Sequence, residues 1–576
     1  MTTAPSLSRS ASRRSRADAR DHSFAALSVP AFRLLWIAGL ISNIGTWMQS
    51  VGAQWQLVDD GSSAAVVALV QTASAAPVLL LALPSGVLGE FLNRRRVLIV
   101  AQVVQLGASL ALALLSGGGG LTPAALLTLT FVLGAAAAVQ MPAAQAITSD
   151  VVPARLIPDA ASLSSISVNV ARAVGPAAAG LLIAQLGVTA VFIANAASFV
   201  LYLVALLAWR TYVAPLSRPE PFLDATRAGL RYVLHARVIR SLYVRLVLFL
   251  LPANALWALL PVLAQKTFGL GAAGYGLLLA ALGGGSIAGA LLLRAARSRL
   301  GVNGVLLASM AGFGVALCAL LLTNSLWVVG FAMVGAGMGW IGVIATVNGV
   351  VQGFLPAWVR TRGLSIYQLV LFGGTAVGSA VAGAIAGAVG AETVVVSAGF
   401  IILALATAQL LLPVRVPVGI GRGIVSIEES PGPERSADER AALVTVSYLV
   451  PLENREEFRS VMGMVAQTRY RTGARTWHMY ETTERPDEIV EMYTLGSWRE
   501  HIAQLRSRHT EWDADLLRRA AALSTREPLV EHFVDLPVSR HSENGRAHPS
   551  PSERLSRLTR TGARSADGFA PPLSAR

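Results

Sequence analysis

The chain has 576 residues, of which 54% are hydrophobic and only 14% are charged, and its mean hydropathy is +0.56. So apolar a composition excludes a soluble protein of this length and predicts a polytopic membrane protein whose main partner is the lipid bilayer. The net charge of +14 does not predict nucleic-acid binding, because the basic residues lie in tails or flank apolar runs and form no basic stripe with interleaved aromatic residues.

The first 24 residues are rich in Ser and Arg and lack the apolar core of a cleavable signal peptide, so we expect a disordered, basic N-terminus. Twelve apolar runs follow, each long enough to predict a membrane-spanning helix. They lie at 32–57, 64–88, 97–115, 121–139, 160–182, 188–207, 241–264, 272–293, 305–322, 326–347, 365–389 and 393–412. The expected membrane part is therefore all-α, with six-helix bundles at 25–209 and 241–413 joined by a linker at 210–240.

Charge is distributed unevenly over the connections between these runs. One set of alternate connections carries most of the arginines: Arg94, Arg95, Arg96, Arg155, the segment 210–240, Arg294, Arg297, Arg299, Arg360 and Arg362. The opposite connections carry Asp59, Asp60, Lys266 and Glu392. Because basic connections stay on the cytoplasmic side, this bias predicts a multi-pass protein of the bacterial plasma (inner) membrane with both termini in the cytoplasm.

The connection between the second and third runs, 86–96, reads GVLGEFLNRRR. It resembles the signature loop between helices 2 and 3 of the major facilitator superfamily, G-x-L-a-D-R-x-G-R-[RK]. The matching positions are Gly86, Leu88, Arg94 and Arg95, and the departures are Glu90, Phe91 and Asn93. The resemblance implies a twelve-helix transporter, in which we expect Glu90, Arg94 and Arg95 to latch one conformation by reaching the neighbouring half.

Internal repetition supports the same fold. Gly289 follows Gly86 by 203 residues, and the same displacement carries Pro153 onto Pro356. It also carries the run Ala173, Val174, Gly175, Gly180 and Gly187 onto Ala376, Val377, Gly378, Gly383 and Gly390. One offset at three separate places predicts two six-helix halves in the same orientation, which is the parallel repeat of major facilitator transporters.

The fifth run contains the sequence VNVARAVGPAAAGLLIAQLG, in which small residues permit close helix packing and Pro176 permits a kink. Gly175, Pro176 and Gly180 are the candidate kink and packing residues. The Gly-Pro element resembles the helix-5 signature of antiporters in the superfamily, which implies export.

Arg172 lies about halfway along the same run, where an arginine facing lipid would cost several kcal/mol. We therefore expect its side chain to face a cavity or a partner. One interpretation is that Arg172 binds an anionic substrate group or controls a nearby proton. The other is structural pairing with carbonyl groups or with an acid.

Amides and aromatic residues at membrane depth predict a broad cavity for amphipathic small molecules, because rings stack and amides orient a ligand. The candidates, apart from Arg172, are Asn43, Trp47, Gln54, Asn254, Trp257 and Asn348. Hydrogen bonding between helices is the alternative explanation for such residues.

Energy coupling has no obvious carrier, because the middles of the runs contain no Asp or Glu. The candidates for proton coupling lie at the ends of the runs: Asp59, Asp60, Glu90 and Asp150. No G-x-x-x-x-G-K-[ST] pattern occurs, which argues against ATP hydrolysis. Proton antiport is thus implied by the resemblance alone.

After a linker at 414–440, the segment 441–536 changes to a soluble composition with the order βαββαβ, which predicts a ferredoxin-like α+β domain. With RTGARTWHMYE and SWREHIAQLRSRHTEWD it resembles the dimeric α/β-barrel domains related to antibiotic-biosynthesis monooxygenases. A similar tail follows the transporter core in the transmembrane secretion effectors, which include siderophore exporters. The segments LSVPAFRLLWIAGLISNIGTWMQSVGAQW and VRTRGLSIYQLVLFGG look like that branch too. The end of the chain, 537–576, is expected to be disordered.

Several residues of this domain invite an enzymatic interpretation: Trp477, His478, Trp498, His501 and His509. However, His501 and His509 are eight residues apart on a predicted Arg-rich surface helix, and no His/Cys/Asp set has metal-ligand spacing. We therefore expect a dimerisation or regulatory module, no enzyme activity, no metal and no cofactor.

Together these observations predict a secondary active exporter of amphipathic small molecules, such as a drug, siderophore or secondary metabolite, that is coupled to protons and works by alternating access. An importer or a lipid flippase on the same fold is one alternative. A membrane-anchored sensor or scaffold centred on the soluble domain is another.

Overall fold

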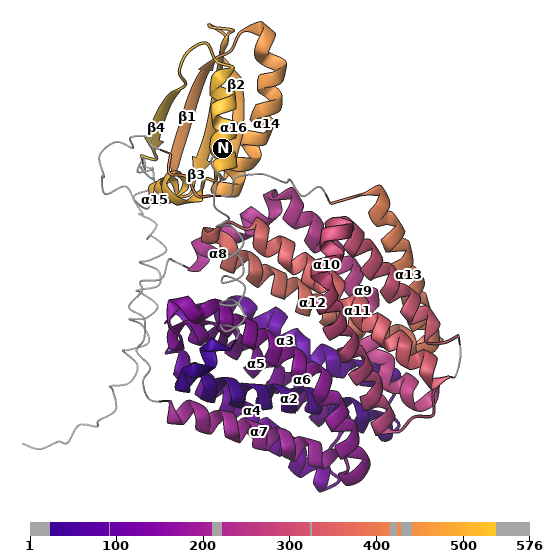
Figure 1. The fold of residues 1–576 in the computed structure, drawn as a ribbon. Helices are drawn as coiled ribbons and strands as arrows, with labels where there is room; N and C mark the ends of the chain where they lie inside the picture. Colours follow the sequence, from indigo (N-terminus) through magenta and orange to yellow (C-terminus); the bar gives the residue numbers. More distant parts are fainter. Residues whose placement is uncertain are drawn as a thin grey trace, which may run out of the picture.

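The structure is a computed structural model that describes residues 24–91, 93–209, 222–322, 325–414, 423–427 and 440–536. The segments expected to be disordered, 1–24 and 537–576, lie outside these ranges except for Phe24. Figure 1 shows two helical bundles and a small soluble domain.

Twelve long helical segments form the membrane part. The N-terminal bundle contains α2 (Pro30–Asp59), α3 (Ala64–Phe91), α4 (Arg94–Gly117), α5 (Pro123–Val151), α6 (Ile157–Leu186) and α7 (Val188–Ala208). The C-terminal bundle contains α9 (Arg237–Lys266), α10 (Ala272–Ala319), α11 (Leu326–Phe354), α12 (Ala357–Val389) and α13 (Ala391–Leu411). The amphipathic helix α8 (Phe222–His235) precedes α9.

Ten helices of the described chain are long and apolar enough to cross a membrane, and α10 is counted once among them. At 48 residues α10 is about twice the length needed for one crossing. Gly301 divides it, because its φ of 65° and ψ of −176° are not helical. These two parts, together with the 30-residue α2, complete the twelve predicted spans.

The predicted repeat is present in the structure. Adding 203 to the bounds of α5 and α7 gives the bounds of α11 and α13. Gly187 and Gly390, which are related by the same offset, end α6 and α12 with positive φ angles of 81° and 88°. The two halves are therefore parallel repeats, as expected for the major facilitator fold.

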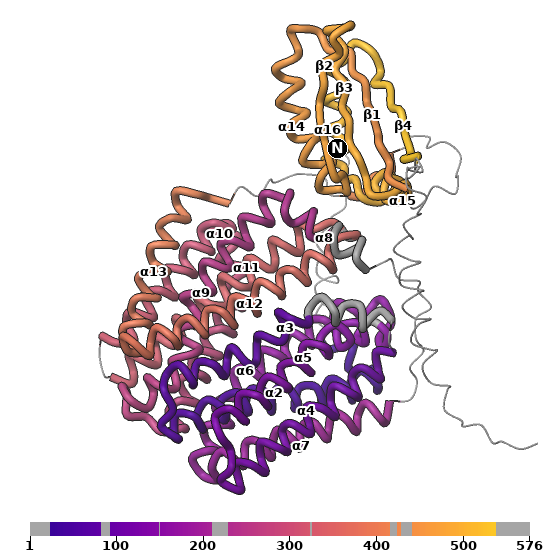
Figure 2. The backbone as a smooth tube through the Cα atoms, turned by 180° about the vertical axis from the view of Figure 1, so that it is seen from behind, coloured from indigo at the N-terminus to yellow at the C-terminus, as the bar shows by residue number. Residues whose placement is uncertain are grey.

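The two halves meet through α3 against α12 and α6 against α10. Gly383 of α12 approaches Ala65 and Ala68 of α3, and Gly180 of α6 approaches Ala272 of α10. These residues lie near the last turns of α6 and α12 and the first turns of α3 and α10, whereas the soluble domain contacts the start of α12 and lies beside α8 (Figure 1, Figure 2). Gln368 of α12 donates a hydrogen bond of 3.7 Å to Met141 Sδ of α5. Among the described hydrogen bonds between the halves, this one lies nearest to the soluble domain.

The soluble domain has the predicted βαββαβ order. Its elements are β1 (Ala442–Leu449), α14 (Arg455–Thr472), β2 (Thr476–Glu481), β3 (Glu488–Leu495), α15 (Trp498–Ala503), α16 (Glu511–Ala522) and β4 (Leu529–Val534). The sheet order is β2-β3-β1-β4 with every neighbouring pair antiparallel, and Val444 pairs with Tyr493 in register. The sheet packs against α14 and α16 around a separate core that includes Phe458, Met462 and Leu516.

One predicted element of this domain is wrong. The sequence predicts one Arg-rich surface helix that carries both His501 and His509, whereas the structure has α15, a π-helical turn and α16. Thr510 starts α16 with a capping box. Its hydroxyl accepts from the backbone N–H of Asp513, and the Asp513 carboxylate accepts from the backbone N–H of Thr510. His501 and His509 at this break are fully buried rather than on a helix surface.

Candidate functional site

A row of aromatic side chains crosses the boundary between the two halves near the middle of the membrane part. It begins with Trp47 of α2, whose ring lies 6.0 Å from Trp257 of α9. Trp257 in turn lies 5.7 Å from Trp340 of α11, in an edge-to-face arrangement. We call these three side chains the tryptophan row.

Arg172 of α6 is the charged member of this site, because its guanidinium carbon lies 5.5 Å from the centre of the Trp47 ring. The buried Nε of Arg172 and the buried Nε1 of Trp257 have no hydrogen-bond partner among the described residues. Buried donors without acceptors are costly, so two of them at one site favour a ligand that carries acceptor oxygens.

A polar layer closes the site on the side remote from the soluble domain. Gln54 of α2 donates to the Trp257 carbonyl at 3.1 Å and accepts from the Tyr275 hydroxyl at 2.7 Å. Tyr275 also stacks on Trp55 at 5.9 Å. Gln54 therefore joins α2 to both α9 and α10, across the two halves. Sequence analysis found Gln54 but missed Tyr275, which lies near a span end where a tyrosine is common.

Glycines permit the close helix contacts around the site. A Cβ on Gly175 would lie 2.6 Å from the Trp47 Cβ, and one on Gly180 would lie 2.7 Å from the Ala272 carbonyl oxygen. Pro176 is buried between them within a continuous α6. Gly175 thus brings α6 against Trp47 within one half, whereas Gly180 brings the two halves together.

The other predicted cavity residues bind neighbouring groups. The Asn43 amide donates to the Ser167 hydroxyl of α6 at 3.3 Å. Asn254 is buried and donates to the Leu250 carbonyl of its own helix at 2.7 Å, and Asn348 accepts from Gln352 at 3.1 Å. The Asn43 contact joins two helices, as the helix-packing alternative expects, whereas Asn254 and Asn348 bind groups of their own helices.

The arginines of the predicted latch loop bind within their own half. Arg94 forms a bidentate ion pair with Asp150 at the end of α5, at 2.8 and 2.9 Å. Arg95 donates to the carbonyls of Leu206 and Leu207 of α7. The predicted contact of these two arginines with the neighbouring half is therefore not made in this conformation, because carboxylate and carbonyl acceptors are nearer within the bundle. The other latch candidates are Gly86, Leu88 and Glu90, and the side chains of Leu88 and Glu90 lie outside the described part of the chain.

The remaining acids proposed for proton coupling lie far from the tryptophan row. Asp59 and Asp60 are exposed at the remote end of α2, where Gln56 donates to Asp60 at 3.0 Å. Asp150 lies at the opposite end of the bundle, in its ion pair with Arg94. The structure therefore brings none of these three carboxylates to the site of Arg172.

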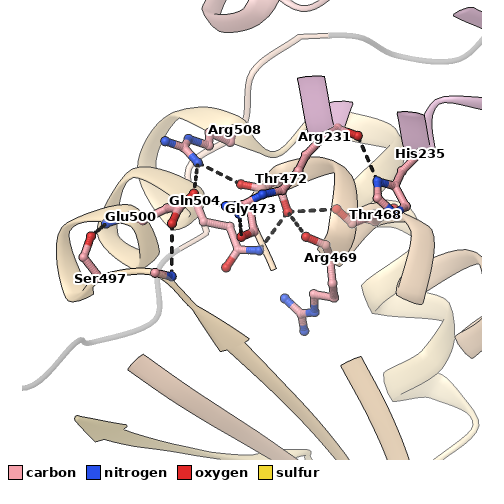
Figure 3. Close-up of polar contacts among 11 residues, drawn as sticks. Arg231, His235, Thr468, Arg469, Thr472, Gly473, Ser497, Glu500, Gln504 and Arg508 are labelled. Carbon is pink, nitrogen blue, oxygen red and sulfur yellow. Dashed lines mark hydrogen bonds and ion pairs between the residues drawn. The ribbon is translucent and has the colours of Figure 1, made fainter. Parts of the chain in front are cut away.

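The soluble domain docks on the C-terminal half (Figure 3). Arg231 of α8 donates to the Gly473 carbonyl at 2.7 Å and lies 3.5 Å from Glu500. His235 of α8 stacks on Tyr470 of α14, with ring centres 4.9 Å apart.

A second contact reaches a membrane helix. The Arg508 guanidinium lies 5.0 Å from the ring of Trp358, at the start of α12. Arg508 is fixed by the Thr472 carbonyl at 3.1 Å and by Glu500 at 3.5 Å. The soluble domain thus contacts both the helix that precedes α9 and the end of α12, and sequence reasoning gave no signal for either contact.

The soluble domain contains a buried ionic cluster around Glu491 of β3. Arg469 of α14 binds Glu491 through two hydrogen bonds of 2.9 and 3.2 Å, and both side chains are almost fully buried. Trp477 and Tyr448 also donate to Glu491. Burial lowers the pKa of Arg469, but the attraction of Glu491 outweighs this and raises the pKa well above its ordinary value.

A family model described as "transmembrane secretion effector" matches residues 21–541 of the chain. The multidrug efflux pump Tap of Mycobacterium tuberculosis is 30% identical over 223 residues, which cover 37% of this chain and 53% of Tap. The staphyloferrin A transporter of Staphylococcus aureus is 24% identical over 287 residues, which cover 49% of this chain and 71% of that protein. The chain thus matches about half the length of the efflux pump.

Solved transporters share the fold of the membrane part. A mutant form of the nucleoside transporter NupG aligns with a TM-score of 0.57 at 13% identity and covers 66% of this chain and 99% of its own. A bacterial homologue of the human lysosomal transporter Spinster, in an inward-facing and unoccupied conformation, aligns with a TM-score of 0.54 at 16% identity. It covers 67% of this chain and 96% of its own.

Proposed function

The chain belongs to the transmembrane secretion effector family of the major facilitator superfamily, and we propose that it is a secondary exporter of amphipathic small molecules. The observation that carries this proposal is the site formed by Arg172 and the tryptophan row, which spans both halves of a transporter fold. The efflux function of Tap and the siderophore named for the staphylococcal transporter support the same substrate range.

The substrate class follows from the chemistry of the site. Three indole rings offer apolar faces for a flat or aliphatic body. Arg172 and the Trp257 Nε1 offer donors for acceptor oxygens, and the guanidinium favours an anionic group. We infer that the preferred substrates are drugs, siderophores or secondary metabolites that combine an apolar body with a carboxylate or a cluster of oxygens.

Transport requires the two halves to rock around this site. The described contacts between the halves lie toward the end remote from the soluble domain, so we infer that the site opens toward the soluble domain in this conformation. The positive-inside bias supports a cytoplasmic soluble domain and cytoplasmic termini. The latch through Glu90, Arg94 and Arg95 would then belong to the opposite conformation, in which the cytoplasmic ends of the two halves meet.

Coupling to protons is a further part of the proposal. The carrier must change its exposure during the cycle, and Asp150 meets this condition if the latch loop rearranges, because Arg94 would then release it. Asp59, Asp60 and Glu90 remain the other candidates.

The glycine contact between the halves gives a first prediction. We expect Gly180→Val to disfavour the described conformation by about 2 kcal/mol, because its side chain would overlap the Ala272 carbonyl. Spin labels at Ser63 and Thr393, on the remote ends of the two halves, should report a longer mean distance. Gly383→Val should act alike, whereas Gly284→Val should not, since nothing lies within 4 Å of a Cβ there. Equal distances in all four proteins would contradict this role of Gly180.

Substrate export can be tested in cells that express the chain. Two sets of cells, one expressing the wild-type chain and one expressing Gly180→Val, are loaded with anionic and neutral fluorescent amphiphiles. We expect the wild-type cells to lose the anionic amphiphiles faster than the Gly180→Val cells. Faster accumulation instead of loss would indicate an importer. Movement of labelled phospholipid without movement of the dyes would indicate a flippase.

We also propose that the soluble domain forms dimers through the open face of its sheet. Core residues such as Val446 and Tyr493 face α14 and α16, so the alternate residues face away. This open face includes Leu449, Tyr480, Leu529 and Phe533, which are 38 to 52% exposed. These apolar side chains share the face with polar ones such as Glu531, and their exposed area favours association with a second copy.

The dimer gives a second prediction. Residues 440–536, which have their own core, should sediment as a dimer, and Phe533→Asp should convert them to a monomer because it places a charge within the apolar face. Leu452→Asp is the matched control, since Leu452 is 75% exposed in the turn after β1 and lies off the sheet. A wild-type monomer at high concentration would refute the dimer.

A further inference from the structure

An open groove lies between the beginning of α9 and the end of α13, and its volume is about 580 Å³. One wall is a stripe along α9 that contains Arg237, Arg240, Val244, Arg245 and Leu248. Arg237, Arg240, Val244 and Leu248 follow one another at steps of three or four residues, and Arg245 lies three before Leu248, so they share one face of the helix. We call this hollow the basic groove.

The end of the basic groove nearest the soluble domain is cationic and has no acidic partner among the described residues. Arg245 donates to the Gln409 side chain at 2.9 Å and to Ser241. Arg240 donates to the Leu234 carbonyl at 3.2 Å. All of these acceptors are uncharged, so they leave the positive charge of the groove uncompensated.

The other end of the basic groove is apolar and open. Val244 and Leu248 on α9 are 53% and 45% exposed, and Leu405 of α13 also lines the groove. From Arg237 to Leu248 the stripe runs eleven residues, or about 16 Å at 1.5 Å per residue. This length is about half of the roughly 30 Å hydrocarbon core, so the groove spans one leaflet.

We propose that the basic groove binds a phospholipid with an anionic headgroup, taken from the leaflet on the side of the soluble domain. Arg237 and Arg240 hold the headgroup phosphate, because guanidinium groups bind phosphate oxygens in pairs. Arg245 lies one to two turns deeper and adds its charge near the glycerol oxygens. One acyl chain lies along Val244 and Leu248. Basic pockets between membrane helices that continue into apolar surface are suited to such lipids.

The bound lipid would lie beside the part of the chain that carries the soluble domain. Arg237 is the first residue of α9, and only Ala236 separates it from α8, whose Arg231 and His235 hold the soluble domain. An anionic headgroup at Arg237 would therefore stabilise the α8–α9 junction on which that domain docks.

The test uses the full-length chain in nanodiscs that contain equal amounts of dioleoylphosphatidylglycerol and dioleoylphosphatidylcholine. Native mass spectrometry of the released protein counts the lipids that remain bound. We expect wild-type protein to retain phosphatidylglycerol selectively. The double variant Arg237→Gln/Arg240→Gln should reduce this preference roughly 30-fold, because two charges near the headgroup, each worth about 1 kcal/mol, are lost. Both side chains are exposed, so the fold should tolerate the change.

Two further variants keep the proposal falsifiable. Arg294→Gln removes an exposed arginine from α10, outside the groove, and should leave the preference unchanged. Leu248→Trp keeps every charge but fills the apolar end, and should reduce retention of the lipid. Equal retention of the two lipids by wild-type protein, or an equal loss of preference in Arg294→Gln and the double variant, would overturn the proposal.

Discussion

Replacing Arg172 by alanine is expected to reduce the affinity for anionic substrates about 30-fold, and their transport in proportion. The guanidinium lies against Trp47 at the boundary of the two halves, and its buried Nε has no partner among the described residues. A charged hydrogen bond to a substrate oxygen is worth about 2 kcal/mol, which corresponds to that factor. Binding measured by quenching of tryptophan fluorescence, beside transport in vesicles, would determine the effect.

The controls for Arg172 separate binding from folding. Arg172→Lys keeps the charge but loses the planar fork, so an intermediate affinity is expected. A neutral substrate that stacks on the tryptophan row should be transported at a nearly unchanged rate by Arg172→Ala. If all substrates were affected alike and the purified variant were aggregated, Arg172 would have the structural role instead.

Replacing Glu491 by alanine is expected to destabilise the soluble domain by about 3 to 5 kcal/mol. The substitution leaves Arg469 charged and buried without its carboxylate, and it also removes the acceptor of Trp477 and Tyr448. Burial and the negative charge of Glu491 raise the pKa of the Tyr448 hydroxyl, whereas the positive charge of Arg469 lowers it. The net result is a raised pKa. Tyr448 therefore remains a neutral donor.

Hydrogen exchange in the full-length chain would measure the effect of Glu491→Ala, with faster exchange expected throughout β1, β3 and α14. Glu481→Ala is the control, because Glu481 is 49% exposed in its pair with Arg455 and such pairs contribute at most about 1 kcal/mol. The double variant Arg469→Met/Glu491→Leu should recover most of the stability, since it leaves no buried charge. Slow exchange in Glu491→Ala would show that the ion pair contributes little.

The membrane fold could be predicted from the sequence because lipid imposes long apolar runs on the chain. The runs located the twelve spans, and the offset of 203 located the repeat that α5, α7, α11 and α13 now display. The bounds differ mainly at the end near the soluble domain, where α12 begins at Ala357 rather than at 365. Hydropathy falls at the membrane surface, whereas backbone hydrogen bonding continues for another two turns.

The site was predicted only in part, because its members come from helices that are distant in sequence. Hydropathy identified Arg172, Trp47 and Gln54 as unusual, but only packing could reveal that Tyr275 meets Gln54 across the two halves. Asn254 and Asn348 were equally unusual in sequence and instead bind groups of their own helices. A polar residue at membrane depth thus indicates a partner without specifying which one.

The buried charge of the soluble domain left a signal that could have been used. Along β3 the alternation of Ile489, Glu491, Tyr493 and Leu495 places the glutamate on the same face as core residues. An inward glutamate requires a cation, and Arg469 on α14 is that partner. The docking of this domain on α8 and Trp358 had no such pattern, because it is a contact between two separately folded parts.

Transport by the purified chain in liposomes tests the proposed function most directly. Vesicles are selected in which the soluble domain faces outward, a pH gradient with an acidic interior is imposed, and the uptake of anionic amphiphiles is recorded before and after the gradient is collapsed. A proton-coupled exporter should accumulate the substrate only while the gradient exists, and Arg172→Ala should abolish most of this uptake. Uptake that is indifferent to the gradient, or substrate movement in the opposite direction, would contradict the account.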